Sequence, residues 1–150
     1  MIETGTELVN HLFESVAADR MAVLYIGVGE VFSIMVRRRN SGLVRRKRFA
    51  EIAIQVMSEI VDEDDFQLHT ATDDLVRDSL SLIEQYSINA TDALVLCSAV
   101  QVANDLRSEG HDLVLIASDV RLLQAGRAEG LSIFNPETDS LPQLQIFVDN

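Results

Sequence analysis

Three acidic residues stand at positions of this sequence where a carboxylate could do chemistry. Glu30 follows an apolar run typical of a buried strand, Asp92 lies in the first turn expected of a long helix, and Asp119 follows a second apolar run. In open α/β sheets, ligands bind outside the carboxyl ends of the strands, where the following helices begin. We therefore expect these three side chains to converge on one crevice.

Carboxylates gathered in one crevice repel one another, and their pKa values rise unless a cation neutralises them. Oxygen ligands without cysteine or histidine select Mg²⁺ or Mn²⁺. Such an ion activates water and stabilises charge on a phosphoryl group. Glu30, Asp92 and Asp119 are thus the candidate metal ligands and catalytic residues. The alternative, for each acid taken alone, is an ordinary helix-start residue stabilised by the helix dipole.

The stretch from 88 to 119 positions two of these acids. Asn89 and Thr91 are candidate caps for a helix that Gly110 ends. The apolar run 113–116 is typical of a buried parallel strand. Apolar residues between the caps and the glycine recur at steps of three and four, which predicts one buried helix face: Ala93, Leu96, Cys97, Val100 and Ala103.

Helices and strands alternate along the rest of the chain. The patterns predict helices at 5–19, from Glu30 to 39, and at 44–61, 72–85 and 120–128, and strands at 22–27, 66–69, 131–134 and 144–148. The glycines of GVGE at 27–30 are expected to allow a tight turn into the second helix. This alternation implies an α/β class with parallel strands joined by right-handed crossovers. We expect a single domain over 1–150, with 136–150 as a C-terminal tail or an extra strand.

Three segments together carry a family resemblance. They are TDALVLCSA at 91–99, LVLIASD at 113–119 and AEGLSIFNPE at 128–137. They resemble the C-terminal half of a PIN domain, and the resemblance runs from about residue 5 to 136. It implies a three-layer α/β/α fold with a mostly parallel sheet. It also implies a metal-dependent ribonuclease of the kind found as the toxin of toxin–antitoxin pairs, with Asp92 and Asp119 at the positions of the family's acids. RNA, an antitoxin protein and a second copy of the chain are then the expected partners.

The sequence departs from the PIN family at the family's first strand. PIN domains place that strand at the centre of the sheet and end it in a metal-binding aspartate, whereas MIETGTELVNHLFE at 1–14 looks like the stretch that follows it. The chain is therefore either a ribonuclease or a truncated or inactive PIN-like module that binds a partner protein or RNA without cutting. LQIFVDN at 144–150 resembles the first strand and would place Asp149 as its aspartate; the alternative is a tail that packs on an edge.

Basic residues gather in RRRNSGLVRRKR at 37–48, which holds seven of the 12 in the chain. These side chains could bind RNA phosphates. They could equally receive an acidic partner such as an antitoxin, or form a solvated helix face. The candidate RNA-binding residues are Arg37, Arg38, Arg45, Arg46, Lys47 and Arg48.

Composition limits the remaining classes of function. The net charge of −12 weighs against nonspecific binding of nucleic acid by the surface as a whole. An apolar content of 47% argues against disorder, and the apolar runs are far shorter than a membrane span. The sequence opens with no cationic, apolar leader, and its one cysteine, Cys97, lies on an apolar helix face. We therefore expect a reduced, cytoplasmic compartment and no membrane partner.

Overall fold

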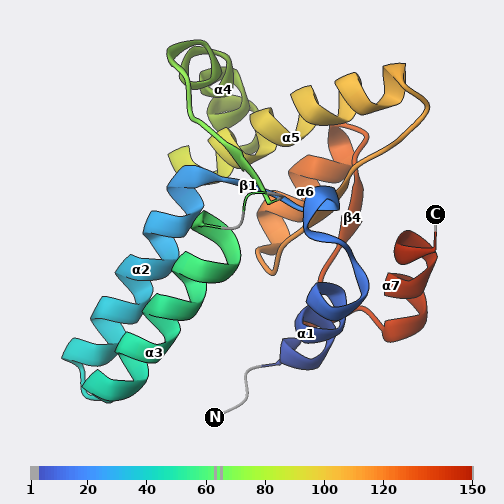
Figure 1. Ribbon diagram of the computed structural model, residues 1–150. Helices are drawn as coiled ribbons and strands as arrows, with labels where there is room; N and C mark the ends of the chain where they lie inside the picture. The colour runs from blue at the N-terminus through green and yellow to red at the C-terminus, as the bar shows by residue number, and fades with distance from the viewer. Residues whose placement is uncertain (1–3, 63, 65, 150) are drawn as a thin grey trace. The chain divides into compact units, whose positions relative to one another are not determined.

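A computed structural model describes residues 4–62, 64 and 66–149 of the chain. This part of the chain is mixed α/β and mostly helical, with seven α-helices and four short strands in two parallel pairs (Figure 1). It divides into two compact units. The larger unit comprises Met1–Ala17 and Thr72–Asn150, and the smaller unit comprises Ala18–Ala71. Each unit is described by itself below.

The smaller unit is a helical hairpin carried by a pair of strands. Its elements are the 3₁₀ turn η1 (Ala18–Arg20), β1 (Ala22–Leu24), α2 (Tyr25–Asn40), α3 (Arg46–Val56), the π-helical turn η2 (Met57–Val61) and β2 (Gln67–His69). β1 and β2 are parallel, with Val23 opposite Leu68. Helices α2 and α3 lie between these strands in the sequence and pack side by side (Figure 1). The break predicted between the helices ending at 39 and starting at 44 is confirmed, although α2 still includes Asn40, and Gly42 takes a left-handed φ of 76° there.

The larger unit holds the second strand pair and most of the buried core. Its elements are α1 (Thr6–Ser15), α4 (Asp73–Tyr86), α5 (Ala90–Ser108), β3 (Val114–Ile116), α6 (Val120–Ala128), β4 (Ser132–Phe134) and α7 (Leu141–Val148). β3 and β4 are parallel, with Leu115 opposite Ile133. The α/β class and the parallel pairing are therefore confirmed, while a three-layer sheet and a single domain stay predictions.

Helix α5 supplies the centre of this core. Ala93, Leu96 and Ala103 on its predicted apolar face are fully buried. They pack with side chains from the elements that follow, which include Leu115 of β3 and Leu122 of α6. A Cβ atom at Gly126 would lie 2.8 Å from Leu115 Cδ2, so a larger residue there would require the Leu115 side chain to shift.

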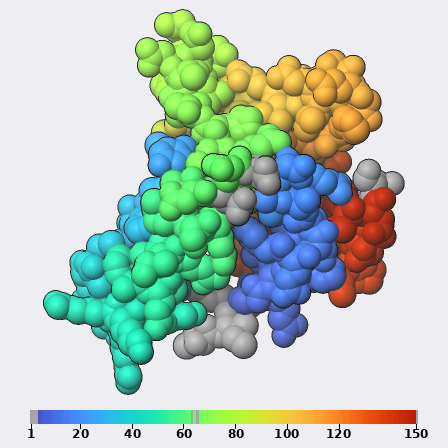
Figure 2. Space-filling view, viewed as in Figure 1, coloured from blue at the N-terminus to red at the C-terminus, as the bar shows by residue number. Residues whose placement is uncertain are grey.

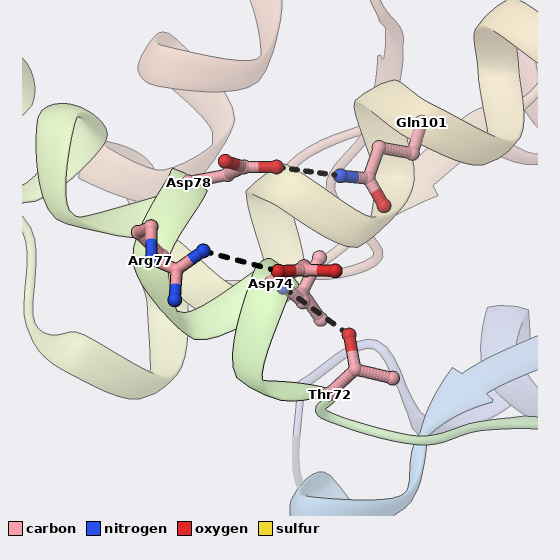
Figure 3. A network of polar contacts seen from close by, with 6 residues as sticks. Thr72, Asp74, Arg77, Asp78 and Gln101 are labelled. Atoms are coloured by element: carbon pink, nitrogen blue, oxygen red, sulfur yellow. Dashed lines mark hydrogen bonds and ion pairs between the residues drawn. The ribbon is translucent and has the colours of Figure 1, made fainter.

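Short polar side chains fix where the helices of the larger unit begin. Thr72 Oγ1 accepts a hydrogen bond from the backbone N–H of Leu75 at 3.2 Å, which confirms Thr72 as the cap of α4 (Figure 3). Such caps satisfy N–H groups that the helix itself leaves unpaired.

Beyond the first turn of α4, the Asp78 carboxylate accepts a hydrogen bond of 3.4 Å from the Gln101 amide and so ties α4 to α5 (Figure 3).

The register of β3 leaves one of its edges without a strand in the described part of the chain. Ala117 N–H donates to Phe134 O at 3.1 Å, with Ile116 opposite Phe134 in the parallel pair. Peptide groups alternate in direction along a strand, so those of Leu115 and Ala117 point toward β4. Those of Val114 and Ile116 therefore point to the other edge of β3.

The predicted strand at 144–148 is wrong, because this segment belongs to helix α7. A capping box at Ser140 and Gln143 starts the helix, with the Ser140 N–H donating to Gln143 Oε1 at 2.8 Å. Pro142 sits in the first turn, where its missing N–H costs nothing. These start signals determine the structure of an apolar run that is too short to distinguish helix from strand by its periodicity.

None of the described helices combines the length and the apolar character needed to cross a lipid bilayer.

Candidate functional site

Asp119 lies just beyond the carboxyl end of β3 and is the N-cap of α6. Its Oδ1 atom accepts hydrogen bonds from the backbone N–H groups of Arg121 at 2.8 Å and Leu122 at 3.0 Å. Its other oxygen, Oδ2, makes no hydrogen bond with the residues that the structure describes. One oxygen therefore holds the helix start, and the second is available to a ligand at the carboxyl edge of the strand pair.

Asp92 lies in the first turn of α5, as the sequence predicts. Asn89 is the N-cap, and its Oδ1 atom accepts the backbone N–H of Asp92 at 2.8 Å. The Asn89 amide in turn donates to Asp92 Oδ2 at 2.6 Å. Of the two candidate caps, Asn89 is thus confirmed, and Thr91 is wrong because it lies inside the helix.

Asp92 and Asp119 stand at helix starts on the same side of the turn that joins α5 to β3. The chain leaves α5 through Gly110, which has a left-handed φ of 87°, and turns back toward β3 (Figure 1). The N-terminal turn of α5 and the carboxyl end of β3 consequently both lie away from this turn. The convergence of these two acids on one crevice stays a prediction.

Glu30 belongs to the smaller unit and does not stand at a strand-to-helix junction. β1 ends at Leu24 and α2 begins at Tyr25, so Glu30 is an exposed residue in the second turn of the helix. The predicted tight turn at Gly27 and Gly29 is wrong, since both glycines are helical. Glycine disfavours a helix interior by about 1 kcal/mol relative to alanine; the 16-residue helix forms despite this.

No three His, Cys, Asp or Glu side chains gather as a metal-binding group within the described ranges of the chain. The predicted three-acid site of Glu30, Asp92 and Asp119 therefore remains a prediction.

Asp149 is not the end of a strand. It is the C-cap of α7, and its Oδ1 atom accepts a hydrogen bond of 2.8 Å from the Gln145 side chain. The hypothesis that LQIFVDN forms a replacement first strand is therefore wrong over residues 144–149, because the backbone of that segment is helical.

The basic residues occupy the two helix ends that face each other across the α2–α3 turn. Arg37, Arg38 and Arg39 lie in the last turn of α2, and Arg45 is the N-cap of α3. Figure 2 shows long side chains of this region, coloured teal near residue 45, extending from the surface. Like Arg37 and Arg38, the four residues from Arg45 to Arg48 are exposed, as a phosphate-binding role requires.

No sequence pattern predicted the hydrogen bond between Tyr86 and Glu129 in the larger unit. The Tyr86 hydroxyl, at the end of α4, donates to Glu129 Oε1 just beyond α6 at 2.5 Å.

On α5, burial raises the pKa of the Cys97 thiol, and the carboxylates of Asp78 and Glu129 raise it further. The thiol therefore stays protonated and lacks the thiolate character of a nucleophile, which agrees with its predicted place on an apolar helix face.

Comparison of this chain with models of protein families, with curated proteins and with solved structures finds no match.

Proposed function

We propose that this chain is a PIN-like domain that acts as a Mg²⁺- or Mn²⁺-dependent ribonuclease, as the toxin of a toxin–antitoxin pair. The observation that supports this proposal most is the position of Asp119. Its carboxylate lies at the carboxyl edge of a parallel strand pair, and it keeps one oxygen outside the bonds that cap α6. That edge is where α/β folds bind their ligands.

The carboxylates of Asp92 and Asp119 have the ligand chemistry that a hard cation prefers. Mg²⁺ usually keeps several water ligands and is held by one or two carboxylates together with substrate phosphates. Asp119 would contribute Oδ2, and Asp92 would contribute a carboxylate that the Asn89 amide orients at 2.6 Å. When bound, the ion would activate a water molecule and stabilise charge on the scissile phosphate.

The chain's own residues divide the remaining work in this proposal. Asp92 and Asp119 hold the cation, and the helices that they begin are packed on the core and restrain their backbones. The basic residues of the hairpin hold the phosphates of the RNA: Arg37, Arg38, Arg45, Arg46, Lys47 and Arg48. An antitoxin protein and a second copy of the chain belong to the same proposal as partners.

The second candidate is a PIN-like module that binds RNA or a protein without cutting. It is favoured by the structural roles that the acids already have. Asp119 caps α6 through two backbone N–H groups, and Asp92 forms a reciprocal pair with Asn89. Each of these arrangements stabilises a helix start whether or not a metal binds.

Two substitutions at Asp119 separate its role as the N-cap of α6 from its proposed role as a metal ligand. Asp119→Asn keeps a cap oxygen but removes the charge, so we expect nearly unchanged stability and at least tenfold weaker Mn²⁺ binding, measured by calorimetry. Asp119→Ala removes both and should also lower the free energy of unfolding by about 1 kcal/mol. Asp92→Asn should behave like Asp119→Asn. Equal Mn²⁺ affinity of the wild-type chain and both asparagine variants would reject the metal site and leave the binding module.

A further inference from the structure

The first turn of α3 carries positive charge where a helix disfavours it. Arg45 is the N-cap, and Arg46, Lys47 and Arg48 are the first three residues of the helix. The N-terminus of a helix bears a partial positive charge, and cations there are destabilising. The N-cap position favours Ser, Thr, Asp or Asn, and the Arg45 side chain makes no capping hydrogen bond. Helix formation alone therefore does not explain these residues.

The arginines on the other side of the turn differ in this respect. Arg37, Arg38 and Arg39 lie in the last turn of α2, where cations are favoured. Arg39 has a further structural role, because its guanidinium stands 4.6 Å from the centroid of the Phe49 ring and bonds Asn40 Oδ1 at 3.2 Å. The basic stretch thus divides into a part with a folding role, on α2, and a part without one, on α3.

The cations of α3 are also largely unneutralised. The side chains of Arg45, Arg46 and Lys47 form no hydrogen bond or ion pair with any residue within the described ranges. Arg48 reaches Glu51 only at 3.4 Å, and both side chains are about half or more exposed, at 64% and 49%. Such exposed pairs neutralise little charge.

The charge of the chain is distributed unevenly between the two units. The smaller unit contains eight basic and eight acidic residues, whereas the larger contains four basic and sixteen acidic residues, together the 12 and 24 of the whole chain. The larger unit therefore repels a polyanion. A polyanion that binds this chain is attracted to the basic stretch of the smaller unit.

We propose that Arg45, Arg46 and Lys47, the α3 cation turn, contact the phosphate backbone of RNA, and that their placement trades stability for this contact. The identity of the polyanion as RNA rests on the proposed function. Arginine presents a fork of N–H donors that matches phosphate oxygens, and lysine adds a mobile point charge. Exposed charges without a pocket suit a backbone recognised by its charge, and release of its counterions drives binding.

The test measures RNA affinity and thermal stability on the same variants. Arg45→Ser/Arg46→Ala/Lys47→Ala removes the α3 cation turn, and Arg77→Ala/Arg121→Ala/Arg127→Ala removes the same charge from the larger unit. Binding of a fluorescent 20-nucleotide oligouridylate is followed by anisotropy in EDTA from 50 to 300 mM KCl. We expect the first variant to lose at least tenfold in affinity and to flatten the logarithmic salt slope by about 2, at roughly 0.7 per phosphate contact. We also expect its melting temperature to rise by about 2–4 °C.

The control variant should keep its RNA affinity within about twofold of the wild-type chain. An unchanged salt slope in the α3 variant, or a lower melting temperature, would overturn the inference. Tighter binding of polyglutamate than of oligouridylate would overturn it in favour of an acidic protein partner. Since EDTA removes metal from the assay, Asp92→Asn and Asp119→Asn should bind RNA as the wild-type chain does. A result that rejects the metal site would then leave the proposed α3 contact with RNA unaffected. A result that rejects the α3 contact would likewise leave the metal site unaffected.

Discussion

The hydroxyl of Tyr86 and the carboxylate of Glu129 join the ends of two helices that are 43 residues apart in the chain. Tyr86 lies at the end of α4 and Glu129 follows α6, and the hydrogen bond between them is 2.5 Å long. The Gln85 side chain also donates to the Tyr86 hydroxyl at 2.8 Å. The contact ties α4 to the strand-bearing part of the larger unit by a polar bond at the margin of the core.

This contact predicts a dependence of stability on alkaline pH. The hydrogen bond to Glu129 raises the pKa of Tyr86 above its ordinary value of 10.0, and burial and the charge of Glu129 raise it further. The folded pKa therefore exceeds the unfolded one, so the stabilisation is present below about pH 10 and is lost as the pH rises through the folded value. Tyr86→Phe should lower the free energy of unfolding by about 1 kcal/mol at pH 8.

Urea unfolding of both proteins between pH 8 and 11.5 measures this effect. The difference in free energy between them should be constant below pH 10 and shrink above it. The Cys97 thiol, whose pKa is also raised, is common to both proteins and cancels in the difference. A difference that stays flat to pH 11.5 would contradict the prediction.

Gly5 predicts a second effect on stability. Its φ is 85°, and a Cβ atom there would lie 2.6 Å from the carbonyl oxygen of Pro136. Gly5→Ala should cost about 1 kcal/mol from the left-handed backbone and a further 1–3 kcal/mol from the clash. Gly110→Ala is the matched control, because its φ is 87° and nothing lies within 4 Å of its added Cβ. Thermal unfolding should therefore show a larger loss at Gly5; equal losses would show that α1 shifts freely against residue 136.

Local signals in the sequence predicted much of the larger unit. Helix α6 spans the predicted residues 120–128, and the caps Thr72 and Asn89 were identifiable because each precedes an apolar helical pattern. The apolar face of α5 was identifiable for the same reason. At these positions propensity, capping and periodicity all favour one structure, and tertiary packing favours the same structure.

The predictions from the sequence were wrong where local signals conflict. Gly27 and Gly29 disfavour a helix, yet the chain continues from β1 straight into α2, which placed Glu30 in the second helical turn rather than at a junction. The apolar run after Gln143 suits either strand or helix, and the capping box at Ser140 and Gln143 selects the helix. The predicted convergence of Glu30 with Asp92 and Asp119 stays a prediction, because it would depend on contacts distant in sequence that no local pattern specifies.

The open edge of β3 leads to the last prediction. The peptide groups of Val114 and Ile116 point away from β4, and no strand within the described ranges covers them. Val114 and Ile116 are half-buried residues, and buried peptide groups without partners are costly. The proposed PIN-like fold predicts a parallel strand on this edge that ends in a metal-binding aspartate. We therefore predict that the 150 residues alone have little or no nuclease activity, since their carboxylates position the cation poorly, and that the proposed ribonuclease activity needs this further carboxylate.

An added strand tests this prediction directly. An apolar strand ending in aspartate is fused through a short turn to the start of α1 at Thr6, and RNA cleavage with Mn²⁺ and thermal unfolding are measured. The fusion should raise both the cleavage rate and the melting temperature, because it supplies the missing carboxylate and pairs the free peptide groups. A fusion that ends in alanine should keep the gain in melting temperature and lose the activity, since only the carboxylate differs. Rapid metal-dependent cleavage by the unmodified chain would show instead that Asp92, Asp119 and Glu30 suffice for catalysis.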